Sequence, residues 1–324
     1  MGFFKTLFSG KEETPADNQE KNQEREFDVL KYDGLRALKI GETQYAIRCF
    51  DKALAIRKDE ETMNFLAQAQ LQNHDTESAY NTLSQIAESA SAPSSAYISM
   101  AKLCDIQQNF QRMDEVCTKG LQVCPQQAEL LYWSGKAKHA LLDEFQAIAM
   151  LTRAIQQDGN LLQAYMLRAE ILCLMNSLND AEADVDFVLQ HSDENEEAMM
   201  IKADINMKKG QIAEAIEYYE KVKTLNPLLP EAYVKLSTAY AANHQLDQSL
   251  NCMNEAVEFM PDSSECYKER GRVKLLLNDK AGAMDDVKKA LECNPNAAQA
   301  LDGKYSNIEQ EMNDMYKTRN PYGF

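Results

Sequence analysis

The sequence predicts an all-α solenoid of about eight helix pairs, followed by a C-terminal capping helix. The 324 residues include only 12 glycines and 8 prolines. The residue types Ala, Leu, Glu, Lys and Gln are common in the chain, and they favour helix. A small residue recurs eight times at steps of 33 and then 34 residues, and a fixed period of this size is typical of a solenoid. A large apolar residue precedes each small one by four positions, the spacing of neighbours on one helix face.

The period holds at four positions of the repeat. The first small residues are Gly34, Ala67, Ala101, Gly135, Ala169, Ala203, Ser237 and Gly271. The large residues before them are Leu30, Met63, Tyr97, Leu131, Tyr165, Met199, Tyr233 and Tyr267. Two further sets keep the same steps: Ala46, Ala79, Met113, Ala147, Ala181, Ala215, Ser249, Ala283, and Ala53, Ile86, Gly120, Ala154, Val188, Val222, Ala256, Ala290. Since small residues let helix axes approach closely, we expect two packed helices in each repeat.

This pattern resembles the tetratricopeptide repeat, which has a bulky residue at position 4, small residues at 8, 20 and 27, and proline at 32. Proline occupies position 32 in four repeats, at Pro125, Pro227, Pro261 and Pro295. Position 11 is usually apolar in the family but here holds Gln70, Lys138, Asn206 and Lys274. The resemblance implies a right-handed superhelix with repeats at 27–59, 60–93, 94–127, 128–161, 162–195, 196–229, 230–263 and 264–297.

The two ends of the chain depart from the repeat. Residues 9–26 carry almost no apolar side chain, so within 1–26 we expect a disordered acidic linker after a short apolar N-terminal segment. Near the other end, apolar residues recur at steps of three and four and predict an amphipathic capping helix over 298–317. Its apolar positions are Ala300, Leu301, Tyr305, Ile308, Met312 and Met315. Residues 318–324 are expected to form a frayed tail.

Two repeats carry a charged pair at equivalent positions. Arg168 and Asp184 occupy positions 7 and 23 of repeat five, and Arg270 and Asp286 occupy the same positions of repeat eight. We predict that each arginine reaches from the first helix of its repeat to the aspartate on the second, because arginine suits partly buried ion pairs.

Composition and motifs exclude several functions. A net charge of −17 opposes binding to nucleic acid phosphates. The sequence has no glycine-rich phosphate loop, nucleophile elbow or H-E-x-x-H motif, and its four histidines lack metal-binding spacing. We therefore expect no enzyme activity, cofactor or metal. No apolar run approaches 18 residues, so no membrane-spanning helix is expected. The eight cysteines are expected to be reduced thiols that fill apolar space, which is typical of a reducing compartment. The chain is therefore predicted to be cytoplasmic.

The resemblance also implies where a partner binds. In tetratricopeptide arrays the first helix of each repeat lines the concave groove, with positions 2, 5, 9 and 12 facing it and 6 and 13 beside them. Across repeats four to seven these positions give a largely apolar stripe that also carries a few charged residues. We take its members as candidate partner-binding residues: Tyr132, Trp133, Lys136, His139, Met166, Glu170, Cys173, Met200, Asp204, Met207, Val234 and Thr238. Position 2 forms an acidic edge of Glu129, Glu197, Glu231 and Glu265.

We interpret this groove as the site of a scaffold or adaptor for a protein or peptide, with an apolar segment flanked by positive charge. For Trp133 and Met166 the alternative is that they pack between helices. Some tetratricopeptide domains clamp the acidic tail of heat-shock chaperones with Lys, Asn and Arg at set positions. Only Lys31 matches that set, so this partner is not expected. Two other hypotheses remain: self-assembly, and a membrane-peripheral organiser that uses residues 1–8 for weak membrane contact.

Overall fold

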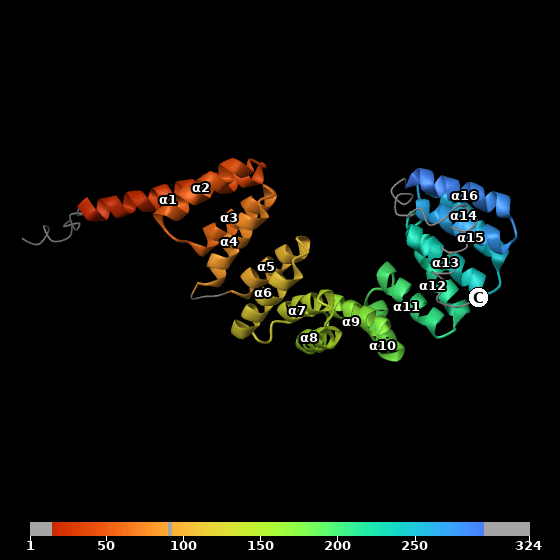
Figure 1. The fold of residues 1–324 in the computed structure, drawn as a ribbon. Helices are drawn as coiled ribbons and strands as arrows, with labels where there is room; N and C mark the ends of the chain where they lie inside the picture. The colour runs from red at the N-terminus through yellow and green to blue at the C-terminus, as the bar shows by residue number, and fades with distance from the viewer. Residues whose placement is uncertain (1–14, 90–92, 295–324) are drawn as a thin grey trace, which may run out of the picture. The chain divides into compact units, whose positions relative to one another are not determined.

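The computed structural model describes residues 15–89 and 93–294, and every regular element in these ranges is an α-helix. The chain divides into two units, residues 1–164 and 165–324. The first contains α1 (Pro15–Lys39), α2 (Thr43–Ile56), α3 (Glu60–Gln72), α4 (Thr76–Ala87), α5 (Ser94–Ile106), α6 (Phe110–Val123), α7 (Ala128–Ala140) and α8 (Glu144–Gln157). Helix α9 (Leu162–Leu174) begins three residues before the boundary and lies mostly in the second unit. The second unit also contains α10 (Leu178–His191), α11 (Glu196–Lys208), α12 (Ile212–Leu225), α13 (Pro230–Ala242), α14 (Leu246–Phe259), α15 (Ser264–Leu276) and α16 (Lys280–Cys293) (Figure 1).

The helix boundaries follow the sequence period. The first helices of repeats two to eight begin at residues 60, 94, 128, 162, 196, 230 and 264, which are the first residues of the predicted repeats. The second helices begin at 43, 76, 110, 144, 178, 212, 246 and 280. The predicted fold of eight helix pairs is therefore confirmed. The predicted capping helix 298–317, the tail 318–324 and the apolar segment 1–8 lie outside the described residues.

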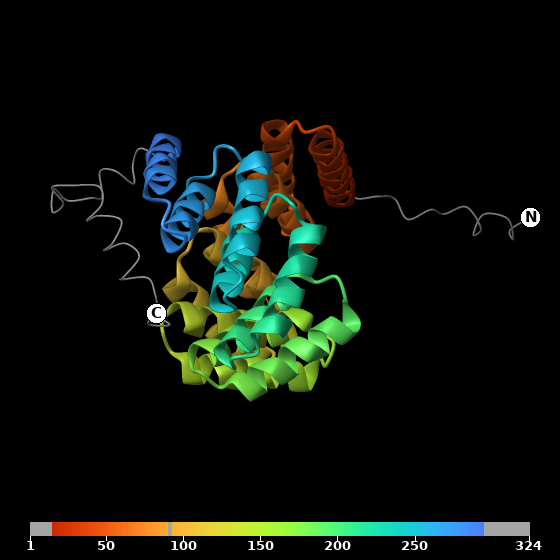
Figure 2. The same ribbon diagram turned by 90° about the vertical axis from the view of Figure 1, so that its right-hand side faces the viewer.

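Helices pack with their neighbours along the chain and across repeats. The two helices of a pair pack together, as in α7 with α8, and the second helix packs against the next repeat, as in α12 with α13. First helices of adjacent repeats also touch, as in α5 with α7 and α13 with α15. Within the second unit, the teal to blue helices α13 to α16 lie side by side in both views (Figure 1 and Figure 2). This stacking is the arrangement expected of a solenoid.

The recurrent small residues mark the points where helices cross. All eight residues at position 20 are completely buried, from Ala46 to Ala283. At position 8, a Cβ added to Gly34 would lie 2.6 Å from Phe50 Cε1, and one added to Gly135 would lie 2.7 Å from Leu151 Cγ. Both neighbours occupy position 24, so a bulky side chain there fills the space that the small residue at position 8 leaves open.

Each helix pair is joined by a tight turn of one type. Position 15 has a positive φ in all eight repeats, at Gly41, His74, Gln108, Leu142, Asn176, Gly210, His244 and Asn278. In repeat four, the backbone N–H groups of Leu142 and Asp143 donate to the carbonyls of His139 and Lys138, both at 2.9 Å, a pattern that ends helices. The Asp143 side chain then accepts from the Gln146 N–H and caps α8.

The predicted charged pairs are present in both repeats. Arg168 donates to the two carboxylate oxygens of Asp184 at 2.6 and 2.8 Å. Arg270 donates to those of Asp286 at 2.5 and 2.9 Å. Both aspartates are buried, so each bidentate pair neutralises a charge between the two helices of one repeat. This prediction is confirmed.

Three of the four polar residues at position 11 have polar partners on nearby second helices. Lys274 lies 2.8 Å from Asp286 and adds a second cation to that carboxylate. Gln70 accepts a hydrogen bond of 2.9 Å from the Thr82 hydroxyl. Lys138 pairs with Asp114 of the preceding repeat at 2.8 Å. The departure from the family pattern therefore exchanges apolar packing for matched polar contacts.

The linker predicted within 1–26 is partly helical, because α1 begins at Pro15. Residues 19–26 are all exposed, which agrees with their polar composition. Their Glu, Gln, Lys and Arg side chains are nevertheless strong helix formers. The helix continues without interruption into the packed part of α1, where Phe27 is buried. The low hydrophobicity of these residues therefore correctly predicts that they do not pack against other helices, but it does not prevent them from forming a helix.

All eight cysteines are free thiols, as expected of small apolar fillers. Burial raises the pKa of Cys104 to about 11 and that of Cys252 to about 12. Since the thiolate is the reactive form, these two side chains act as packing groups.

Loss of the hydroxyl group is expected to change the free energy of unfolding differently at two tyrosines of position 4. Tyr97 donates to the Ala87 carbonyl at 3.2 Å, whereas the fully buried Tyr233 hydroxyl has no hydrogen-bond partner among the described residues. Burial raises the pKa of Tyr233 to about 12. We expect Tyr97→Phe to lower the free energy of unfolding by about 1 kcal/mol and Tyr233→Phe to leave it unchanged or raise it. Urea denaturation measures the free energy of unfolding of both variants. An equal loss of stability in the two would contradict this prediction.

Candidate functional site

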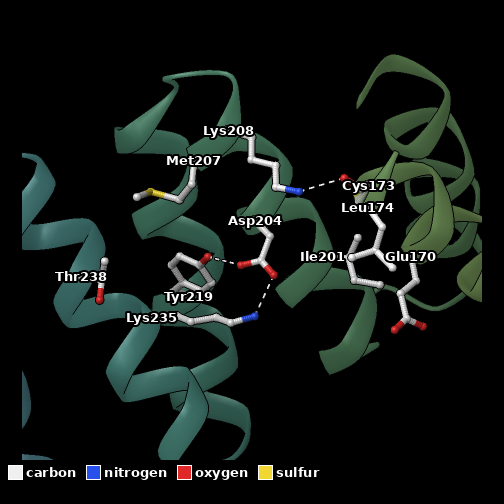
Figure 3. Close-up of a pocket in the computed structure, with 10 residues that line it drawn as sticks. All are labelled: Glu170, Cys173, Leu174, Ile201, Asp204, Met207, Lys208, Tyr219, Lys235 and Thr238. Carbon is white, nitrogen blue, oxygen red and sulfur yellow. Dashed lines mark hydrogen bonds and ion pairs between the residues drawn. The ribbon is translucent and has the colours of Figure 1, made fainter. Parts of the chain in front are cut away.

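The first helices of repeats five to seven surround a pocket with a volume of about 390 Å³ (Figure 3). Helix α9 contributes three residues, α11 four and α13 two, and Tyr219 reaches in from α12. The lining residues are Glu170, Cys173, Leu174, Ile201, Asp204, Met207, Lys208, Tyr219, Lys235 and Thr238. Those from the first helices occupy positions 6, 9, 12 and 13, whose spacing of three and four places them on one helix face.

The carboxylate of Asp204 is neutralised inside the pocket. The Tyr219 hydroxyl donates to one of its oxygens at 2.5 Å, and Lys235 Nζ lies 2.7 Å from the other (Figure 3). Lys235 also pairs with Glu231 at 2.9 Å. Burial alone would lower the pKa of Lys235, but its carboxylate neighbours, Asp204 first, raise it above the ordinary value. Asp204 and Lys235 therefore act as a matched pair rather than as free charges.

The remaining charged groups of the pocket are Lys208 and Glu170. Lys208 donates to the Cys173 carbonyl at 2.8 Å and so links α11 to the last turn of α9. Glu170 is exposed, and no cation of the described chain pairs with its carboxylate. The apolar part of the lining comes from Cys173, Leu174, Ile201 and Met207. The pocket thus offers an apolar surface beside one carboxylate that is available to a ligand.

One thiol, that of Cys173, lines the pocket. Burial raises the pKa of the Cys173 thiol, which disfavours the nucleophilic thiolate. Within residues 15–89 and 93–294, no group of three or more His, Cys, Asp or Glu side chains is placed to hold a metal ion. None of the helices in these ranges is long and apolar enough to cross a membrane.

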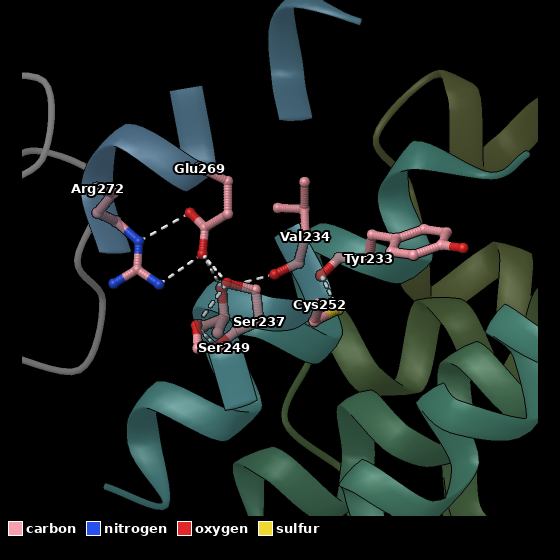
Figure 4. A network of polar contacts seen from close by, with 8 residues as sticks. Tyr233, Val234, Ser237, Ser249, Cys252, Glu269 and Arg272 are labelled. Atoms are coloured by element: carbon pink, nitrogen blue, oxygen red, sulfur yellow. Dashed lines mark hydrogen bonds and ion pairs between the residues drawn. The ribbon is translucent and has the colours of Figure 1, made fainter. Parts of the chain in front are cut away.

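Beside the pocket, a polar network joins repeat seven to repeat eight (Figure 4). Ser237 Oγ donates to Glu269 at 2.8 Å and lies 2.8 Å from Ser249 Oγ, and Arg272 bonds both Glu269 oxygens at 2.6 and 2.7 Å. Ser237 and Ser249 occupy the small positions 8 and 20. Because Glu269 is buried and hydrogen-bonded on both oxygens, it holds α13 and α15 together and is not available to a ligand.

The pocket includes five of the candidate residues predicted from the sequence, which are Glu170, Cys173, Asp204, Met207 and Thr238. The predicted set lacked Tyr219, because it belongs to a second helix. The available signal was a tyrosine at position 24, where the other seven repeats have Phe, Leu, Cys, Val or Met, since its hydroxyl needs a polar partner. Lys208 and Leu174 stand at position 13, which the family pattern places beside the groove.

Two of the candidate residues at position 5 are buried, Met166 and Met200. Met166 and Met200 are each only 7% exposed, and Met200 belongs to the apolar core of repeats six to eight together with the partly buried Val234. For Met166, this burial agrees with the alternative of packing between helices, and we leave Met166, Met200 and Val234 out of the proposed site.

The candidates in repeat four belong to the first unit and contact other residues of that unit, although the buried Trp133 Nε1–H has no hydrogen-bond partner among the described residues. Trp133 packs against the core of repeats two to four and meets Tyr132 edge to face at 5.2 Å. Lys136 lies 5.2 Å from the Trp133 ring centre and 2.6 Å from Asp105. The remaining candidate, His139, hydrogen-bonds Glu144 at 2.7 Å. These four residues therefore stabilise repeat four, and none of them lines the pocket.

The acidic edge is partly neutralised. Glu129 pairs with Lys102 at 2.7 Å, and Glu231 pairs with Lys235 as described. Glu197 and Glu265 have no cation partner in the described part of the chain. At the start of the array, Lys31 pairs with Asp59 and Glu61 at 3.0 and 2.6 Å. The unpaired charge that remains along the predicted groove is mainly negative.

Comparison with known proteins identifies the fold. A family model described as a tetratricopeptide repeat matches residues 196–227, which contain all of α11 and α12. A tetratricopeptide repeat protein from Parabacteroides merdae has a TM-score of 0.59 at 15% identity, with 78% of this chain and 96% of that chain covered. PilW, described as a widely conserved type IV pilus biogenesis factor, has a TM-score of 0.57 at 16% identity, with 64% and 96% covered. At these identities the structures show a shared fold only.

A curated relative matches part of the chain. Hsp70-Hsp90 organizing protein 2 of Arabidopsis thaliana is 25% identical over 103 residues, which are 32% of this chain. The match spans only 18% of the length of that relative.

Proposed function

We propose that this chain, which has the tetratricopeptide-repeat fold, is a non-catalytic scaffold that binds a partner polypeptide in the pocket of repeats five to seven. The observation that supports this proposal is the pocket itself, an opening of about 390 Å³ between three first helices. Most polar groups around it are already paired within the protein, so its apolar wall can be covered by a ligand without leaving buried charges unpaired.

The lining defines the chemistry of the partner. A large apolar side chain fits against Cys173, Leu174, Ile201 and Met207, where it gains energy by removing apolar surface from water. An arginine or lysine beside that side chain pairs with Glu170, whose carboxylate has no cation within the described chain. We therefore propose a segment that combines one large apolar residue with a neighbouring basic residue.

We do not extend the chaperone-organising role named for the Arabidopsis relative to this chain. The one residue that matches the chaperone-tail clamp is Lys31, and its ammonium is held by Asp59 and Glu61. Burial alone would lower the pKa of Lys31, but hydrogen bonds with Glu61 and Asp59 raise it. An acidic tail would have to displace both carboxylates, and Glu170 would repel it at the pocket.

A charge reversal at the pocket tests the proposal. We expect Glu170→Lys to weaken binding of a peptide with a central leucine and a neighbouring arginine at least tenfold, because a carboxylate–arginine pair becomes a repulsive pair. Binding is measured by fluorescence anisotropy on an array of peptides that vary the spacing between leucine and arginine.

Glu258→Lys is the matched control, since Glu258 is an exposed glutamate on α14 and the charge change is the same. Equal losses of affinity in both variants would show that only net charge matters and would contradict binding at the pocket. A loss confined to Glu170→Lys supports it.

A further inference from the structure

Repeat four exposes large apolar side chains at the turn between its two helices. Leu141, Leu142 and Phe145 are 42%, 84% and 77% exposed. Phe145 occupies position 18, where the other repeats have small or polar residues: Gln44, Glu77, Gln111, Asn179, Ala213, Asp247 and Ala281. Seven repeats of the same chain thus show that the fold does not require an aromatic residue there.

Leu142 is the stronger exception. Position 15 has a positive φ in every repeat, and Leu142 has a φ of 63°. The other repeats place Gly, Asn, His or Gln at this position, and none of these has an aliphatic side chain. A leucine is unfavourable in this conformation, and at 84% exposure it gains little packing in return. Its presence stabilises neither the turn nor the core.

A fourth exposed apolar side chain belongs to the neighbouring repeat. Ile106, the last residue of α5, is 73% exposed. Since α5 and α7 pack together and hold the same place in adjacent repeats, their C-terminal ends lie at one edge of the array. We name Ile106, Leu141, Leu142 and Phe145 the repeat-four edge patch. It presents on the order of 500 Å² of apolar surface, the size at which an exposed patch is often functional.

The area of the patch and the charges beside it indicate which kind of molecule can bind there. A stable dimer buries about 800 Å² on each partner, so the patch alone is too small to hold a second copy. The charge that remains beside it is negative. Asp143 is exposed and has no cation partner in the described chain, Lys138 is already paired with Asp114, and Glu144 bonds His139. An anionic lipid surface would be repelled by Asp143 and by the net charge of −17.

We propose that the repeat-four edge patch is a second interaction surface, on which a short amphipathic segment of a partner protein docks. The apolar face of that segment covers Leu142 and Phe145, and a basic residue at its margin pairs with Asp143. The limited area is that of a transient contact. This surface lies at the turns of repeats three and four and shares no residue with the pocket of repeats five to seven.

The test uses variants that carry residues already present in other repeats. Leu142→Asn with Phe145→Gln gives repeat four the asparagine of position 15 in repeats five and eight and the glutamine of position 18 in repeats one and three. The probe is a fluorescent amphipathic peptide of Leu and Lys, compared with one of Leu and Glu. All proteins also carry Glu170→Lys, so that the pocket carboxylate does not contribute and the two proposals fail independently.

We expect the double change to weaken binding of the Leu–Lys peptide at least tenfold, without lowering the melting temperature. Asparagine accepts the positive φ more readily than leucine, so a folding defect is not expected. Leu225→Asn with Leu228→Gln is the matched control, since these leucines are 39% and 67% exposed elsewhere, and it should leave the affinity unchanged. The Leu–Glu peptide should bind none of the proteins.

Three results would overturn the proposal. The first is equal affinity in the double variant and its parent, or an equal loss in the leucine control. The second is self-association of the parent in sedimentation that disappears in the double variant, which would assign the patch to a second copy. The third is co-flotation of the parent with phosphatidylserine vesicles that the double change abolishes, which would assign it to a lipid surface.

Discussion

Replacing Arg168 with alanine is expected to lower the free energy of unfolding by about 3 kcal/mol. The carboxylate of Asp184 is 7% exposed, and Arg168 holds both of its oxygens. The hydrogen bonds with Asp184 raise the pKa of Arg168 above its ordinary value, so the guanidinium remains charged at neutral pH. Without the arginine, the buried carboxyl group of Asp184 loses its cation and two hydrogen bonds between α9 and α10.

The equivalent change in repeat eight provides the comparison. Arg270→Ala should cost less, because Lys274 remains 2.8 Å from Asp286. In repeat five, the double variant Arg168→Ala with Asp184→Ala should recover part of the lost stability, since it removes the unpaired carboxyl group. Urea denaturation followed by circular dichroism gives the free energy of unfolding of the unchanged protein and of these three variants. A smaller loss for Arg168→Ala than for Arg270→Ala would contradict this account.

Gly135→Ala is expected to destabilise the first unit by about 1.5 kcal/mol, although alanine is the better helix former. The new Cβ would lie 2.7 Å from Leu151 Cγ and 3.3 Å from the Ala147 carbonyl oxygen. Leu151 is completely buried, so it cannot move without disturbing the side chains that surround it. The strain of overpacking therefore exceeds the gain in helix propensity.

Repeat five suggests the compensating change. There, Ala169 occupies position 8 and Val185 occupies position 24, so the larger residue at one position is matched by a smaller one at the other. We expect Gly135→Ala with Leu151→Val to be more stable than either single variant. Gly159→Ala should have little effect, because nothing lies within 4 Å of a Cβ at that position. Thermal melting of the four variants tests the pairing, and additive losses would contradict it.

The fold could be predicted because the features that fix it are local and repeated. A small residue at position 8 is required wherever the second helix crosses, so the requirement appears eight times in the sequence. The Arg168–Asp184 pair could be predicted for the same reason, since repeat eight presents the same two residue types at the same positions. Helix at 15–26 was not predicted, because polar composition indicates the absence of packing without excluding helix.

The candidate site was harder to predict, because it depends on which side of each first helix faces a neighbour. Helix periodicity places positions 5 and 9 on the same stripe, yet the structure buries Met200 at position 5 and leaves Asp204 at position 9 in the pocket. The angle between adjacent helices decides this difference, and no single repeat encodes that angle. Tyr219 enters the pocket from a second helix, a route that the stripe does not describe.

The pairing of lysines along the groove also has a kinetic consequence. Lys31, Lys102, Lys136 and Lys235 each lie against a carboxylate of their own or an adjacent repeat. The electrostatic field that reaches a diffusing molecule is then dominated by unpaired carboxylates such as Glu170 and Glu197. A basic partner would be drawn toward the groove before contact, so its association rate should fall as ionic strength rises. Its dissociation rate, set by the apolar wall of the pocket, should change much less.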